Sequence, residues 1–266
     1  MMCDIEEDLA SENWRTRWSC ARRANWTPTP EQVERGLKDE EWVVRKEWAE
    51  RLDFTPTQEQ VNRGFDDIDE DVRASWAKRM DIKPSHVQIS KCLHDTVNVR
   101  RGCAQRMDWT PTPEQIVRGL TDPHSDVRAI WAGRTDWTPT PEQVEVGLKD
   151  PDGYARAAWS YRKDFTPTPE QARIGIEDSH WSVRLVWPLR ADWTPSPEQV
   201  ELRLRDPDIG VRSAWAKRMD WTPTPEQVER GLNDSSEDVK NAWMRRISLM
   251  QDQLMDNEQD SPGSSI

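Results

Sequence analysis

The side chains that could carry out chemistry are few, and they are scattered along the chain. Its four cysteines and four histidines are Cys3, Cys20, Cys92, Cys103, His86, His94, His124 and His180. Structural zinc sites need pairs such as CxxC, and helical zinc motifs need two histidines one turn apart, but neither spacing occurs. We therefore expect reduced, buried thiols, with no metal, no cofactor and no catalytic residue.

Charged residues, by contrast, recur at fixed intervals. One aspartate column comprises Asp39, Asp67, Asp95, Asp122, Asp150, Asp178, Asp206 and Asp234. One basic column comprises Arg45, Arg73, Arg100, Arg128, Arg156, Arg184, Arg212 and Lys240, and a second comprises Arg51, Arg79, Arg106, Arg134, Arg162, Arg190, Arg218 and Arg246. Paired carboxylates can catalyse and arginine stripes can bind phosphate. However, acids and bases at constant offsets favour internal pairing as a ladder between repeats, which we take as the better interpretation.

The interval comes from a repeated segment, Asp108-Trp-Thr-Pro-Thr-Pro-Glu-Gln115. Versions of it begin at Asn25, Asp53, Asp81, Asp108, Asp136, Asp164, Asp192 and Asp220, 28 residues apart except for a third repeat of 27. Such a period is typical of stacked repeats. Thr112 fits a helix N-cap, Pro113 the first helical position and Gln115 the reciprocal partner of a capping box, so the segment predicts a helix start.

Each repeat reads as two short helices. The first has an apolar pair four residues apart, such as Val144 and Leu148, beside a recurrent glycine that predicts close helix packing. The aspartate column then fits the N-cap of a second helix. That helix carries Val-Arg-x-x-Trp-Ala-x-Arg, as at residues 211–218, where Val211 and Trp215 lie one turn apart. Twelve of the sixteen tryptophans fall in two such repeated columns, which favours packing over base stacking.

An Asp followed after four residues by Val-Arg resembles the HEAT-like repeat superfamily. The Thr-Pro-Glu-Gln start and the Val-Arg-x-x-Trp-Ala-x-Arg run are similar to bacterial leucine-rich-repeat-variant repeats, over residues 9–247. The resemblance implies an α-solenoid, most often a binding scaffold, although some HEAT-like proteins are DNA glycosylases. The iron–sulfur cysteine cluster of the variant family is not matched by Cys3 and Cys20.

We therefore predict an all-α, right-handed α-solenoid of eight two-helix repeats with an N-terminal half-repeat cap. Residues 1–24 form an N-terminal segment, frayed as far as Asp8, and a capping helix. Residues 25–247 form the array, and residues 248–266 form a C-terminal cap turn and an acidic tail, disordered from Asp256. Pro188 should kink the second helix of the sixth repeat. The third repeat departs from the pattern at Cys92 and Cys103.

Composition bears on location and partners. With 35% hydrophobic and 32% charged residues, no apolar run long enough to span a membrane and no signal-peptide pattern, we expect a cytoplasmic protein without membrane contact. The formal net charge of -12 disfavours non-specific attraction to nucleic acid and would suit a basic partner.

Function should lie where columns depart from the repeat. A basic first-helix column becomes apolar in repeats five to seven, and second helices of repeats five and six gain apolar residues. Exposed apolar clusters mark interfaces, so the candidate partner-binding residues are Val146, Ile174, Leu202, Tyr154, Tyr161, Trp181, Leu185 and Leu189. Trp14 and Trp42 are secondary candidates near the N-terminus. The competing interpretation is that these helix faces are more buried than a helical wheel suggests.

The sequence thus predicts a non-catalytic protein-binding scaffold whose partner is a protein, with self-association left open. One alternative is a nucleic-acid-binding or DNA-base-processing protein of the HEAT-like kind. Another is an acidic DNA mimic that inhibits a nucleic-acid enzyme, as an anti-defence protein would.

Overall fold

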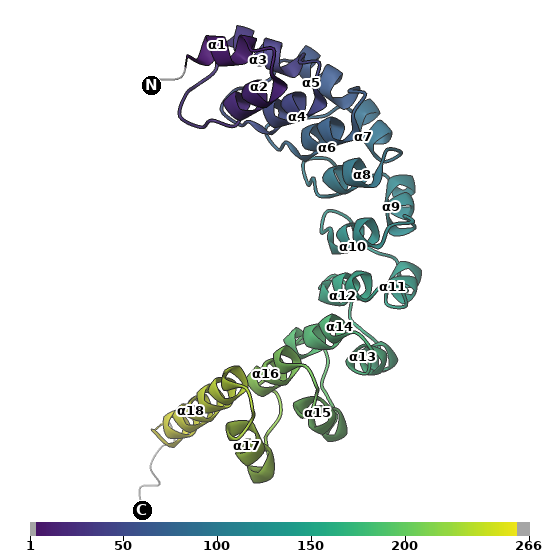
Figure 1. Ribbon diagram of the computed structural model, residues 1–266. Helices are drawn as coiled ribbons and strands as arrows, with labels where there is room; N and C mark the ends of the chain where they lie inside the picture. The colour runs from purple at the N-terminus through teal and green to yellow at the C-terminus, as the bar shows by residue number, and fades with distance from the viewer. Residues whose placement is uncertain (1–3, 260–266) are drawn as a thin grey trace, which may run out of the picture. The chain divides into compact units, whose positions relative to one another are not determined.

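The computed structural model describes residues 4–259, and within them the chain is helical, without a strand. It divides into two compact units, Met1–Trp137 and Thr138–Ile266, called here the N-terminal and C-terminal units. Within each unit the first helices of the repeats form one row and the second helices form another (Figure 1). The expected all-α solenoid of two-helix repeats is confirmed.

The row of first helices comprises α1 (Ile5–Ala10), α3 (Pro30–Leu37), α5 (Gln58–Phe65), α7 (His86–Cys92), α9 (Pro113–Leu120), α11 (Pro141–Gly147), α13 (Pro169–Ile176), α15 (Pro197–Leu204) and α17 (Pro225–Leu232). The row of second helices comprises α2 (Trp14–Ala21), α4 (Trp42–Glu50), α6 (Glu70–Lys78), α8 (Val97–Ala104), α10 (Ser125–Gly133), α12 (Gly153–Tyr161), α14 (Trp181–Val186), α16 (Ile209–Lys217) and α18 (Glu237–Gln259). The helices up to α10 belong to the N-terminal unit.

Capping boxes begin all eight first helices that follow the repeated segment. In α3 the Thr29 hydroxyl accepts the amide of Gln32 at 3.3 Å, and the Gln32 side-chain oxygen accepts the amide of Thr29 at 2.8 Å. The same pair occurs at the start of α5, α7, α9, α11, α13, α15 and α17. The glutamine column is therefore structural, as predicted.

The recurrent glycine brings the two helices of a repeat together. A β-carbon added to Gly36 would lie 2.1 Å from Nε1 of Trp48, and Gly64 and Gly231 stand in the same relation to Trp76 and Trp243. The indole of the second helix thus occupies the space that any other residue of the first helix would need. This close helix packing offsets the conformational entropy that a glycine in a helix loses on folding.

The aspartate column joins successive repeats but does not cap the second helix. Arg45 donates to both carboxylate oxygens of Asp67 in the next repeat, at 2.7 and 2.8 Å, and to the carbonyl of Asp39 in its own repeat, at 2.8 Å. The predicted ladder is confirmed in seven pairs: Arg17–Asp39, Arg45–Asp67, Arg73–Asp95, Arg100–Asp122, Arg156–Asp178, Arg184–Asp206 and Arg212–Asp234.

The predicted N-cap role of these aspartates was wrong. Asp67 accepts the amide of Asp69 at 2.9 Å, so it closes a turn before the helix. Asp69 is the residue that caps α6, two positions later. The following proline, as in Asp122-Pro123, lies in this turn and not in the first helical turn.

The second arginine column is buried and connects repeats through the backbone. Arg190 donates to the carbonyls of Ser160 and Arg162 in the preceding repeat, at 2.7 and 2.5 Å. It also donates to the carbonyl of Phe165 in its own repeat, at 2.9 Å, and to Asp192, which opens the next repeat. Its guanidinium also lies 4.7 Å from the Phe165 ring centroid. In repeats two to eight the opening aspartate therefore neutralises a buried arginine of the preceding repeat.

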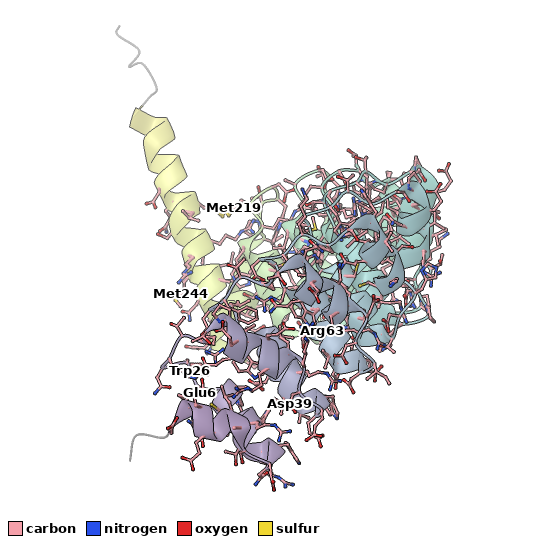
Figure 2. The ribbon with its side chains drawn as sticks, turned by 90° about the horizontal axis from the view of Figure 1, so that it is seen from above. Glu6, Trp26, Asp39, Arg63, Met219 and Met244 are labelled. Atoms are coloured by element: carbon pink, nitrogen blue, oxygen red, sulfur yellow. The ribbon has the colours of Figure 1, made fainter. Side chains whose placement is uncertain are left out.

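Both ends of the chain differ from the prediction. The segment expected to fray contains α1, whose N-cap is Asp4 and which carries Glu6, labelled in Figure 2. Glu6 pairs with Arg35 at 3.2 Å. The N-terminal cap is therefore a helix pair. At the other end α18 continues to Gln259, so the expected cap turn after Ile247 and residues 256–259 of the predicted disordered tail are helical. The rest of that tail lies outside the described residues.

Two irregular repeats keep the same architecture. Pro188 ends α14 at Val186, and residues Trp187–Leu189 form a 3-10 turn, as the predicted kink requires. In the third repeat Cys92 replaces the glycine and Cys103 the tryptophan, and both thiols are buried and free. The hydrogen bond with Cys103, together with burial, raises the pKa of the Cys92 thiol.

Candidate interaction surfaces

A column of basic residues on the first helices connects each repeat to the one before it. Arg63 of α5 pairs with Glu34 of α3 at 2.9 Å, and Arg230 of α17 pairs with Glu201 of α15 at 2.9 Å. Arg35 makes the corresponding pair with Glu6, whereas Lys91 pairs with Asp66, at the end of α5, and Arg118 donates to the carbonyl of Leu93. The Arg63 hydrogen bond lowers the pKa of Glu34 to about 2, although burial of the carboxylate opposes this.

In α11, α13 and α15 this column is apolar. Val146 is 73% exposed and Leu202 is 46% exposed, whereas Ile174 is half-buried. Ile174 lies near Glu145, Lys149 and Gln171, where it lines a shallow gap between α11 and α13. The substitution therefore removes an ion pair and exposes apolar surface on the same helix face. We call these three residues the apolar row.

The other predicted residues lie on the row of second helices. Tyr154 and Tyr161 on α12, Trp181 on α14 and Leu189 after it are exposed, while Leu185 is half-buried. The ring of His180 lies against two of these side chains. Its centroid is 4.7 Å from the Tyr154 ring centroid, and the ring stacks on that of Trp181 with a centroid distance of 6.0 Å. We call these five predicted residues the aromatic face. The structure thus separates the candidates into two groups, one on each row (Figure 1).

Half-burial of Ile174 and Leu185 corrects the expectation that all eight candidates face solvent. Leu185 packs against the core of the C-terminal unit. Ile174 lies between neighbouring first helices, beside Glu145, Leu148 and Gln171. These two residues are poor choices for a surface substitution, because a charge there would also disturb the fold.

Sequence reasoning missed Ile209, an exposed residue at the start of α16. It occupies the same column as Trp181, 28 residues later, so the column comparison could have found it. It also missed Leu52, Met80 and Met107, exposed by 71%, 59% and 46% after α4, α6 and α8. These three residues occupy the same column in three successive repeats. Methionine side chains are flexible and can pack against partners of different shape.

The secondary candidates lie at the start of the N-terminal unit. Trp42 is exposed and Trp14 is half-buried, with the Arg15 guanidinium 4.7 Å from the Trp14 ring centroid. Trp18 lies between them in sequence and donates to Glu47 at 3.1 Å. Because burial dominates over its basic neighbours, the pKa of Glu47 is raised.

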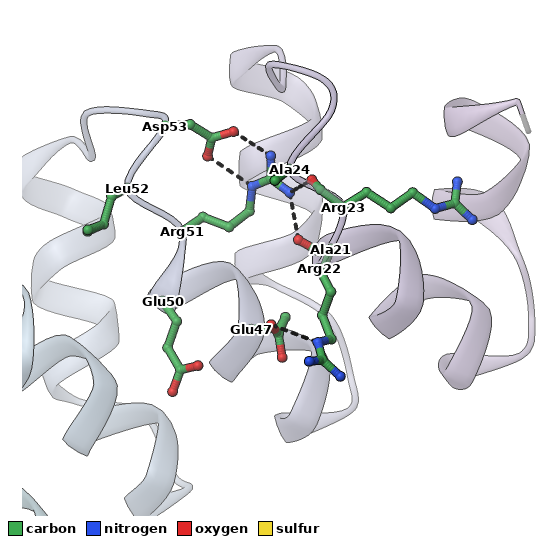
Figure 3. A pocket seen from close by; sticks show the side chains of 9 residues that line it. All are labelled: Ala21, Arg22, Arg23, Ala24, Glu47, Glu50, Arg51, Leu52 and Asp53. Carbon is green, nitrogen blue, oxygen red and sulfur yellow. Dashed lines mark hydrogen bonds and ion pairs between the residues drawn. The ribbon is translucent and has the colours of Figure 1, made fainter.

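A pocket opens at the ends of α2 and α4, lined by residues that include Arg22, Arg51 and Asp53 (Figure 3). Arg51 donates to Asp53 and to the carbonyls of Ala21, at 2.6 Å, and Arg23, at 2.8 Å. Arg22 pairs with Glu47 at 3.5 Å. The cations that line the pocket are engaged within the protein, so the pocket does not offer a free basic site.

An apolar groove lies between α17 and α18. Pro223, Val228, Leu232, Ile247 and Met250 line it. Leu232 is exposed, whereas the corresponding Leu204 is buried, because no further first helix covers α17 among the described residues. The groove is thus the uncovered end of the array.

The described residues contain no group of three His, Cys, Asp or Glu side chains placed to hold a metal ion. None of their helices is both long and apolar enough to cross a membrane. Of the cysteines considered in the sequence, Cys3 lies outside the described residues.

Among solved structures, the chain is similar to one described as a leucine-rich repeat variant with a novel repetitive protein structural motif. The two share 25% sequence identity with a TM-score of 0.52, and the match covers 80% of this chain and 79% of that chain. No protein-family model and no curated protein matches.

The packing and this likeness together define the class of protein: a helical repeat protein of the solenoid type. More particularly, its fold resembles leucine-rich-repeat-variant repeats, as the sequence predicted.

Proposed function

We propose that the protein is a non-catalytic protein-binding scaffold that captures its partner on repeats five to seven. The observation that carries this proposal is the exposure of apolar side chains in columns that are polar elsewhere, above all Val146, Leu202, Tyr154 and Trp181. Isolated apolar residues on a surface are ordinary, but clusters mark interaction sites. Because repeats one, two, three and eight have an ion pair in this column, stacking does not require the exposed side chains of Val146 and Leu202.

The arginine columns support a nucleic-acid-binding function less well than the surface supports the scaffold function. Their guanidinium groups pair with carboxylates and carbonyls inside the array, as Arg190 and Arg212 illustrate. A protein that neutralises phosphates must show a steep decrease in affinity with added salt. A titration with double-stranded and single-stranded DNA from about 50 mM salt upward tests this alternative, and salt-sensitive binding would favour it over the scaffold.

The scaffold proposal is tested by a variant that disables both groups, Leu202→Asp with Trp181→Asp. Ile68→Asp is the matched control, because Ile68 is 93% exposed in the N-terminal unit. Cross-linking and mass spectrometry in cells should find a protein, or a second copy of the chain, joined to the wild type and the control but lost from the double variant. An unchanged set of cross-linked proteins would overturn the proposal. Circular dichroism and melting should be alike for all three.

A further inference from the structure

The column change in repeats five to seven alters charge as well as polarity. In repeats one, two and eight the basic residue of this column pairs with a glutamate 29 residues earlier, as Arg63 does with Glu34 and Arg230 with Glu201. In α13 the residue is Ile174, and the acid that an arginine there would reach, Glu145, pairs instead with Lys149, just after the end of α11, at 2.5 Å. The first-helix face of α11, α13 and α15 therefore lacks three positive charges that the pattern would supply.

A second column keeps its negative charge on the same face. Glu142, Glu170 and Glu198 occupy the second position of α11, α13 and α15, and each is exposed. Among the described residues, Glu142 and Glu198 have no ion-pair partner and interact with the hydroxyls of Thr140 and Ser196. Glu170 pairs with Arg173 at 2.8 Å. We call these three residues the acidic row.

The two rows are adjacent. Glu142 precedes Val146 by four residues, and the same offset separates Glu170 from Ile174 and Glu198 from Leu202. Residues four apart on a helix lie one above the other on one face. Because first helices of successive repeats pack about 8–10 Å apart, the face presents an apolar stripe and a parallel carboxylate stripe with that spacing.

We propose that this face binds a basic amphipathic helix. An α-helix advances about 1.5 Å per residue, so positions seven apart on one side of it are about 10 Å apart, which matches the repeat spacing. Apolar residues at that interval would contact Val146, Ile174 and Leu202, and Lys or Arg residues beside them would face Glu142, Glu170 and Glu198. This inference rests on the scaffold function proposed above and names the chemistry of its partner.

The binding test uses the full chain and a designed helical peptide with leucines seven residues apart and lysines beside them. Fluorescence anisotropy should show binding that weakens as salt rises, because the charges lie at an exposed face. A peptide with glutamate in place of every lysine should bind roughly tenfold or more weakly. Equal binding of the two peptides, or no binding of the lysine peptide at about 50 mM salt, would overturn the proposal.

Two sets of substitutions test the contributions of the apolar row and the acidic row to binding separately. Val146→Arg with Leu202→Arg restores, at the two exposed positions of the apolar row, the residue type that other repeats use, so the fold should be kept while peptide affinity falls roughly tenfold or more. Glu142→Gln, Glu170→Gln and Glu198→Gln together should lower affinity and flatten its salt dependence.

The matched control is Glu31→Gln, Glu59→Gln and Glu114→Gln, which changes the same column in the N-terminal unit and should leave binding unchanged. A peptide that binds the arginine variant, the acidic-row variant and the control equally contradicts the assigned site.

The outcomes distinguish this proposal from the scaffold function. If the Leu202→Asp and Trp181→Asp variant loses a cellular partner but the lysine peptide does not bind the wild type, the scaffold stands and the partner chemistry is wrong. If sedimentation shows a dimer of the wild type that the Val146→Arg and Leu202→Arg variant dissociates, the face binds a second copy, and the basic-helix proposal is overturned.

Discussion

Arg212 of α16 donates to both carboxylate oxygens of Asp234, the residue that closes the turn before α18, with N–O distances of 2.8 and 2.9 Å. The same guanidinium donates to the carbonyl of Asp206 at 2.8 Å, so one side chain fixes the start of two successive second helices. The hydrogen bond from Arg212 holds the pKa of Asp234 below its usual range, while burial opposes this shift. The ladder thus sets the register between repeats.

Replacing one partner of this pair should be costly. Arg212→Met leaves the largely buried carboxylate of Asp234 without its cation, and breaking a buried pair in this way costs about 3–5 kcal/mol. Urea unfolding measures the loss. Arg245→Met is the control, because Arg245 is exposed on the adjacent α18 and should change stability by about 0.5 kcal/mol or less. A loss in Arg212→Met no larger than in the control would mean that the ladder does not stabilise the array.

Stability should decrease in acid because of carboxylates such as Glu34. Hydrogen bonding from Arg63 lowers the pKa of Glu34 to about 2 in the folded chain, below the value of about 4.3 expected when unfolded. A lowered folded pKa contributes stability that is present above the unfolded pKa and is lost as pH falls through the folded pKa. Unfolding free energy should therefore decrease between about pH 4 and pH 2.

Glu34→Gln should make this acid-dependent decrease shallower, whereas Glu59→Gln, an exposed residue on the next first helix, should leave it as in the wild type. Unfolding at a series of pH values, with a carboxylate NMR titration of Glu34, checks both expectations. A Glu34 titration near the unfolded value would refute the assigned cause.

Gly36 should not tolerate even one added methyl group. Its β-carbon would meet the indole of Trp48, whereas a β-carbon added to Gly133 in α10 meets nothing within 4 Å. Overpacking of this kind costs about 1–3 kcal/mol, so Gly36→Ala should be destabilised by that amount. Gly133→Ala should be neutral or more stable by about 0.5–1 kcal/mol, because alanine favours the helix. Thermal unfolding of the two variants should separate them, and equal melting temperatures would contradict the assigned role of the glycine column.

Sequence alone predicted the elements whose residues recur. The capping box at Thr29 and Gln32, the pairing of Arg45 with the next repeat and the glycine–tryptophan packing all follow from columns with a local physical meaning. What it missed depends on contacts between repeats. The α1 helix lacks the Thr-Pro-Glu-Gln start, and its Glu6 pairs with Arg35, 29 residues away.

The candidate surfaces show the same limit. Column comparison identified Val146, Leu202 and Trp181 as unusual, and they are exposed. It could not show that Ile174 and Leu185 are half-buried, because the gap between neighbouring helices depends on side chains of both. The N-cap assignment failed for a related reason: Asp67 and Asp69 both suit capping, and only the position of the preceding repeat's arginine decides between them.

The third repeat offers a test of paired substitution. Cys92 stands where six of the other repeats have glycine, and Cys103 stands where they have the tryptophan that packs against that glycine. A cysteine therefore replaces the large indole, and a second cysteine fills space beside it. Cys103→Trp alone would place an indole against the Cys92 side chain and should lose about 1–3 kcal/mol. Adding Cys92→Gly restores the Gly36–Trp48 arrangement and should recover much of that loss, with a coupling energy of about 0.5–3 kcal/mol in a double-mutant cycle. Additive effects of the two substitutions would show that the cysteines do not substitute for the glycine–tryptophan contact.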